Sequence, residues 1–171
     1  VMLVRSRYIE KIRPFVGLDV VKVITGIRRS GKSVLLQQIQ DEIAQNVDPA
    51  GIFVRINLEE EENSRFLSKG VVHAHVLNIA KKSRDRKVYV FLDEVHDMEY
   101  WEITVNSLRA KKNVDVYITG SNSKLLSGEL ASCLTGRYVD IQVTPFSFAE
   151  FCEAYNADGK RGDAEVFRKY L

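Results

Sequence analysis

Residues 20–33 read VVKVITGIRRSGKS, an apolar run that leads directly into a loop with two glycines. Gly26 and Gly31 stand five residues apart and are followed by Lys32 and Ser33, which matches the phosphate-binding pattern G-x-x-x-x-G-K-[ST]. Such a loop needs a strand before it and a helix after it. Residues 20–25 are mostly β-branched, and apolar residues recur at helical spacing over 33–45, so both elements are predicted.

The remaining chain alternates predicted strands with predicted helices. A continuous apolar run at 88–92 is typical of a central strand that is covered on both faces. This alternation predicts an α/β fold with a mainly parallel sheet. Further strands are predicted at 51–58, 114–119 and 138–143, and further helices at about 64–83, 100–111, 124–130 and 147–155, the last opening with the capping-box sequence SFAE.

Size and composition are those of an ordinary globular domain. The 171 residues contain 45% hydrophobic and 28% charged residues, and the formal net charge is +2. That charge is too small to indicate nucleic acid or a membrane surface by itself. No apolar run approaches the roughly 18 residues that span a bilayer, and no secretory leader is seen. We therefore expect one cytoplasmic domain over 1–171, which forms the N-terminal part of a longer protein.

The glycine loop predicts a particular phosphate site. Its backbone N–H groups and the start of the following helix favour an anion, and the lysine would reach the β- and γ-phosphates. The Ser33 hydroxyl would be a ligand of Mg²⁺. The residues predicted to contact the nucleotide are Gly26, Ile27, Arg28, Arg29, Ser30, Gly31, Lys32, Ser33 and Val34.

A second candidate site follows the apolar strand in VYVFLDE. Two carboxylates at the end of a buried strand are costly unless they bind something. Asp93 is placed to hold Mg²⁺, and Glu94 is placed to accept a proton from an attacking water. A solvated strand end would be the simpler interpretation, but the phosphate loop about 60 residues upstream argues against it.

Two weaker candidates lie further along the chain. In YITGSN, Ser121 or Asn122 would present a polar group to the γ-phosphate, and a plain glycine turn is an equal alternative. In LTGRYVD, Arg137 would stabilise charge on the phosphoryl group in cis or from a neighbouring subunit, and an exposed arginine at a strand start is again an equal alternative.

These motifs together resemble the AAA+ class of P-loop ATPases. The segments GIRRSGKS, FLDEVHDMEYWE, YITGSNSKLLSGELASCLTGRY and TPFSFAEF resemble the bacterial and archaeal branch whose ATPase domain precedes a C-terminal domain of unknown function. The resemblance implies a three-layer α/β/α sandwich with strand order 5-1-4-3-2. It also implies that Lys32 and Ser33 bind phosphate and Mg²⁺, that Asp93 and Glu94 act as metal ligand and general base, and that Ser121 or Asn122 is the sensor.

The expected activity is Mg²⁺-dependent hydrolysis of ATP by a water that Glu94 orients. A slow nucleotide-dependent switch and a P-loop kinase that acts on a small molecule are the alternatives. The chain lacks the guanine motif N/T-K-x-D, so the resemblance favours ATP over GTP. Basic clusters at 81–87 and 109–112 leave DNA open as a partner beside a protein client and self-association, although few aromatic residues interleave them.

Overall fold

A five-stranded parallel sheet forms the centre of the molecule in a computed structural model that describes residues 3–121, 125, 134 and 136–155. The strand order is β2-β3-β4-β1-β5, and every neighbouring pair is parallel. Counted from the other edge this is 5-1-4-3-2, so the predicted α/β class and strand order are confirmed. The strands are β1 Val21–Gly26, β2 Ile52–Asn57, β3 Val88–Asp93, β4 Val114–Ser121 and β5 Tyr138–Val143.

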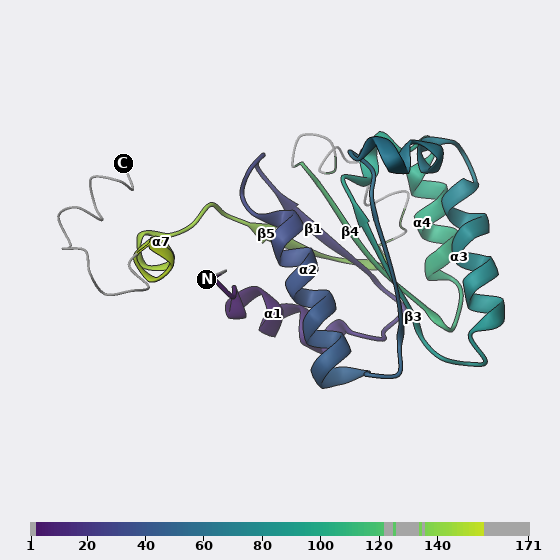
Figure 1. Cartoon of the computed structure of the whole chain (residues 1–171), viewed down its shortest axis with the longest axis horizontal. Coiled ribbons are helices and arrows are strands. Elements are labelled where there is room, and N and C mark those ends of the chain that lie inside the picture. The colour runs from purple at the N-terminus through teal and green to yellow at the C-terminus, as the bar shows by residue number, and fades with distance from the viewer. Residues whose placement is uncertain (1–2, 122–124, 126–133, 135, 156–171) are drawn as a thin grey trace.

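Helices cover both faces of the sheet (Figure 1). On one face, α1 Ser6–Ile12 and α2 Lys32–Glu42 bury apolar side chains against Ile24, Phe91 and Tyr117. On the other face, α3 Val71–Lys82 and α4 Trp101–Arg109 pack on the alternate residues of the same strands. The sheet therefore lies between two layers of helices, which is the predicted three-layer sandwich. A sheet covered in this way has its strands buried on both faces.

Strand β1 has a central place in this sheet. It lies between β4 and β5, and all six of its residues are buried. The register places Gly26 beside both Ser121 of β4 and Val143 of β5. The carboxyl ends of these three strands therefore meet at one edge, where the loop after β1 begins.

Several boundaries differ from the sequence prediction. The helix expected over 64–83 is wrong in its first part, because a 3₁₀ segment covers Glu61–Leu67 and α3 starts only after Gly70, whose φ of 80° is left-handed. Helix α2 continues into a π-helical turn at Ile43–Val47. Strand β4 runs two residues further than expected, so that Ser121 belongs to the sheet.

Some further sequence predictions concern residues that the structure does not describe. Apart from Leu125, the helix predicted at 124–130 lies outside the described residues, and so do the sensor candidate Asn122 and the tail after residue 156. Among the helices that are described, none is long and apolar enough to cross a membrane.

A buried ion pair lies at the opposite end of the sheet, where the strands begin. Lys22 and Asp115 face each other from β1 and β4 with almost no exposure to solvent. Asp115 also accepts hydrogen bonds from the Gly17 backbone N–H at 2.7 Å and the Tyr117 hydroxyl at 3.0 Å. Burial lowers the pKa of Lys22 below its ordinary value, while the Asp115 carboxylate opposes that shift. The pair thus fastens the loop before β1 to the sheet.

Replacing Asp115 with asparagine should lower the free energy of unfolding by about 3 kcal/mol, because Lys22 would remain buried without its counter-charge. Urea unfolding measures the loss. A second substitution, Lys22→Met, should recover part of it, since it removes the uncompensated ammonium. Asp41→Asn, at an exposed position of α2, is the matched control. If the double variant is less stable than Asp115→Asn alone, the unpaired charge of Lys22 is not the cause of the lost stability.

Candidate functional site

The loop after β1 is held in a shape that depends on its glycines. A Cβ built on Gly26 would lie 2.5 Å from the Val143 carbonyl oxygen and 2.6 Å from Ser30 Oγ, so no side chain fits there. Gly31 has a φ of 90°, which favours glycine, and Arg29 also has a left-handed φ of 64°. Helix α2 begins immediately afterwards at Lys32. The loop therefore delivers the N-terminus of α2 to the carboxyl edge of the sheet, where it favours an anion.

Lys32 brings the loop into contact with the carboxylate that follows β3. Its Nζ donates to the Ile27 carbonyl at 3.2 Å and lies 3.6 Å from Glu94 Oε1. The lysine side chain is 5% exposed and the glutamate side chain 14%, so the two groups meet in a sheltered position. Two residues that are 62 positions apart in the sequence thus share one edge of the sheet.

Thr119, near the end of β4, fixes both acidic residues. Its hydroxyl donates to Asp93 Oδ1 at 2.5 Å and accepts from the backbone N–H of Glu94 at 2.9 Å. Glu94 has a φ of 53°, a left-handed conformation in which the chain turns sharply out of β3. This arrangement holds the two neighbouring carboxylates in different places, Asp93 buried and Glu94 toward the cleft.

Asp93 retains one oxygen that fits a metal. The residue is 1% exposed, and its Oδ2 has no hydrogen-bond partner among the described residues. A buried carboxylate oxygen left in that condition is costly, and carboxylate is the ligand type that Mg²⁺ prefers. Asp93 does not line the cleft that Glu94 faces, but the exposed hydroxyl residue Ser33 does, and both lie at the end of the sheet where the strands finish. A carboxylate and a hydroxyl oxygen are donors that suit Mg²⁺.

A cleft of about 940 Å³ contains most of the predicted site residues. It offers lysine and arginine side chains beside the loop backbone, with carboxylates opposite. That mixture suits a ligand that carries both phosphate and metal. Its lining residues are Ile27, Arg28, Arg29, Gly31, Lys32, Ser33, Val34, Glu59, Glu94, His96, Asp97 and Ser121.

Three of these lining residues were not predicted. His96 Nδ1 lies 3.4 Å from Glu94 Oε2, and its Nε2 lies 3.4 Å from Asp97 Oδ1. Glu59 begins the acidic run EEEE at 59–62, a pattern that is typical of a solvated surface. His96 and Asp97 follow the acidic pair after Val95 in the sequence DEVHD, so proximity to Glu94 was the available signal. Glu59 reaches the cleft because β2 ends beside β3, with Asn57 paired to Asp93.

Arg137 does not join the site within this chain. It precedes β5, and its carbonyl accepts the backbone N–H of Val21 at the start of β1. Its exposed guanidinium pairs with Asp19 at 2.9 Å. Because β1 and β5 are parallel and six residues long, their starts lie roughly 20 Å from the edge that carries the loop. Of the two roles that the sequence left open for Arg137, the one in cis does not fit this position, and the one from a neighbouring subunit stays a prediction.

Comparison with protein families gives one match that covers most of the chain. A family model described as "AAA domain" matches residues 19–152, which includes the loop, both acidic residues and β5.

Two curated relatives match at the sequence level. An uncharacterized protein of Haemophilus influenzae is 40% identical over 159 residues, which is 93% of this chain and 40% of the relative. An uncharacterized protein of Methanocaldococcus jannaschii is 33% identical over 142 residues, which is 82% of this chain and 30% of the relative. The chain thus spans less than half the length of either relative.

A solved structure shares the fold at low sequence identity. Cdc6p of Pyrobaculum aerophilum superposes with a TM-score of 0.60 and 11% identity, over 88% of this chain and 48% of that one. Similarity at this level of identity concerns the arrangement of strands and helices alone.

Proposed function

The chain belongs to the AAA domain family, and from this membership and the geometry of the cleft we propose that it binds ATP with Mg²⁺ and hydrolyses it. One observation carries the proposal. Lys32, Glu94 and the unpartnered oxygen of Asp93 lie at the same edge of the sheet as the glycine loop. These are the groups that a triphosphate, an attacking water and a divalent cation require.

Glu94 is the proposed general base. Its carboxylate faces the cleft. The hydrogen bond between its backbone N–H and the Thr119 hydroxyl fixes the backbone that carries this side chain. The carboxylate would orient a water toward the γ-phosphate and accept the proton as the water attacks. His96 Nδ1 lies 3.4 Å from the second carboxylate oxygen, where the imidazole would restrict the movement of the Glu94 side chain.

Lys32 has two competing partners in this scheme. Its ammonium is 3.6 Å from Glu94, and phosphate oxygens entering the loop would compete for the same charge. Binding of the triphosphate would move Lys32 away from Glu94 and leave the carboxylate available to the water. The lysine would then stabilise the negative charge that develops on the transferred group.

Ser33 and Asp93 are the proposed holders of Mg²⁺. When bound, the ion would neutralise phosphate charge and align the β- and γ-phosphates. We also propose that residues 1–171 form one ATP-binding core domain of a longer protein, which the partial coverage of both relatives supports. Its client, whether protein or DNA, and its self-association belong to that longer chain.

The test is multiple-turnover phosphate release from MgATP by the full-length protein, with EDTA and MgGTP as comparisons. We expect free phosphate to accumulate over many turnovers, to stop with EDTA and to be slower with GTP. A single stoichiometric release followed by a stable ADP complex would instead support the nucleotide switch. Transfer of phosphate to a small-molecule acceptor would support the kinase. No binding of MgATP at all would overturn the proposal.

A further inference from the structure

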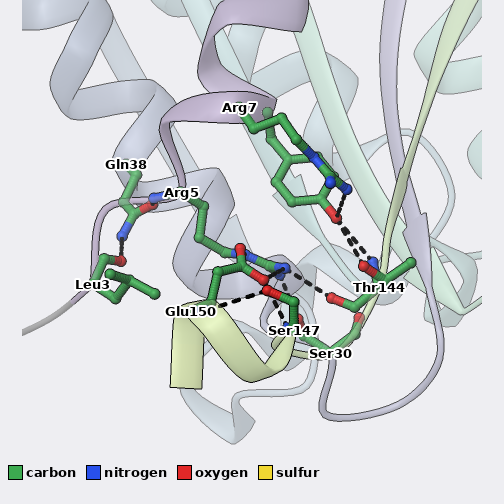
Figure 2. Close-up of polar contacts among 9 residues, drawn as sticks. Leu3, Arg5, Arg7, Ser30, Gln38, Thr144, Ser147 and Glu150 are labelled. Carbon is green, nitrogen blue, oxygen red and sulfur yellow. Dashed lines mark hydrogen bonds and ion pairs between the residues drawn. The ribbon is translucent and has the colours of Figure 1, made fainter. Parts of the chain in front are cut away.

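Arg5 is a buried arginine that contacts the phosphate loop from behind. Its side chain is 2% exposed. Nη1 donates to the Ser30 carbonyl at 3.0 Å, Nη2 donates to the Thr144 carbonyl at 2.9 Å, and Nε donates to Glu150 Oε1 at 3.1 Å. Figure 2 shows the guanidinium between the loop, the segment after β5 and the first turn of α7, which spans Phe148–Tyr155. One planar fork of donors thus joins three parts of the chain.

The contact with Ser30 fixes an amide of the phosphate cradle. A peptide unit is planar and trans, so the Ser30 carbonyl and the Gly31 N–H point in opposite directions. Because Arg5 holds the carbonyl, the Gly31 N–H is directed away from Arg5. Gly31 lines the cleft and directly precedes Lys32. The guanidinium therefore sets the orientation of a peptide at the point where the loop becomes α2.

Arg5 also anchors the segment that carries it. Its backbone N–H donates to Gln38 Oε1 of α2 at 3.0 Å, and Gln38 Nε2 donates to the Leu3 carbonyl at 2.7 Å. Its guanidinium carbon lies 4.6 Å from the ring centre of Tyr8 and 5.2 Å from that of Phe146. These contacts give the arginine little freedom, so a shift of one partner is transmitted to the others.

Glu150 accepts hydrogen bonds from the Arg5 guanidinium and at the same time caps α7. Its carboxylate accepts the Ser147 backbone N–H at 2.8 Å, and its own N–H donates to Ser147 Oγ at 3.2 Å, which completes the predicted capping box. Burial raises the pKa of Glu150, but the hydrogen bonds from Ser147 and Arg5 outweigh it, so that the pKa lies below its usual value. The carboxylate is therefore charged at neutral pH. Helix α7 itself stands apart from the sandwich (Figure 1).

We propose that Arg5 is a positioning residue that couples the phosphate loop to α7 through Ser30 and Glu150, so that nucleotide in the loop tightens the docking of α7. This coupling rests on the proposed nucleotide binding. It is reciprocal, because a contact that binding strengthens must in turn strengthen binding. Undocking of α7 therefore weakens nucleotide affinity.

The test combines MgADP affinity with deuterium exchange of α7 in the full-length protein. In the unsubstituted protein, saturating MgADP should slow exchange in α7 several-fold. Arg5→Lys keeps the charge but loses the fork, so it should abolish that slowing and raise the Kd for MgADP about tenfold. Glu150→Gln keeps the cap but removes the charge that strengthens the pair, so it should change both readouts in the same direction by a smaller factor.

Two matched variants separate coupling from general damage. Ser147→Ala removes the cap hydrogen bond but not the arginine contact, so α7 should exchange faster while MgADP still slows it. Arg7→Gln removes a neighbouring exposed charge that contacts the Tyr8 hydroxyl, and it should change neither readout.

The outcomes separate the coupling from the function on which it rests. If MgADP binds normally and α7 exchanges at the same rate with or without it, the coupling is overturned while nucleotide binding stands. The coupling is likewise overturned if Arg5→Lys and Glu150→Gln both retain the full effect of MgADP. If the unsubstituted protein binds no nucleotide, the proposed function fails and the coupling fails with it.

Discussion

Replacing Lys32 with alanine should weaken binding of MgATP by about 100-fold or more, as measured by calorimetric titration of the full-length protein. The ammonium is 5% exposed and lies within 3.6 Å of the Glu94 carboxylate. The pair that matters for affinity is the one that Lys32 would form with the phosphates. Removing one partner of such a sheltered charge pair costs about 2–5 kcal/mol, and 1.4 kcal/mol corresponds to a factor of ten in affinity. The variant loses the charge that would meet the phosphates and leaves Glu94 to repel them.

The control for this variant is Lys111→Ala. Lys111 is exposed and follows α4, away from the cleft, and its substitution changes the net charge by the same amount. It should leave MgATP affinity unchanged. If the two variants bind MgATP equally well, Lys32 does not contact the phosphates and the cleft is not the nucleotide site.

Replacing Glu94 with glutamine should lower the turnover of ATP by roughly 100- to 10,000-fold, which is the usual contribution of a general base. The amide keeps the size of the side chain but accepts no proton from water. Affinity for MgATP should stay the same or increase, because Lys32 loses its competing carboxylate. Steady-state phosphate release measures the first effect, and titration with MgATP measures the second.

Glu99→Gln supplies the comparison for this substitution. Glu99 is an exposed acidic residue five positions further along, outside the lining of the cleft, and its loss should not alter turnover. Normal turnover by Glu94→Gln would show that another group activates the water. Loss of binding together with turnover would place Glu94 among the binding residues instead.

The loop and the alternation of strands and helices were predictable from the sequence because each is encoded by residues close together in the chain, whereas the strand order was implied only by the resemblance to the AAA+ class. The glycine loop is recognised by its spacing, and strand β3 by an unbroken apolar run. Strand ends were less predictable. Nothing in YITGSN indicates that β4 continues to Ser121, since that length depends on pairing with Gly26 of β1.

Contacts across long sequence separations were the part that the sequence did not reveal. Arg5 is one basic residue among several near the N-terminus, and its place behind the loop follows only from the packing of α1 and α2. The location of Arg137 could have been predicted, because a residue that precedes a strand of a parallel sheet lies at the end of the sheet where the strands begin.

The position of β1 between β4 and β5 has a consequence for the order in which the chain folds. The strand that leads into the cleft is synthesised early, yet both of its hydrogen-bonding neighbours begin more than 90 residues after it begins. Pairings of such long range are slow to form, since the intervening chain must first be brought together. During synthesis we therefore expect β1 to lack its native neighbours until β4 has emerged, whereas β2 and β3 can pair earlier. The cleft is among the last parts of the domain to assemble.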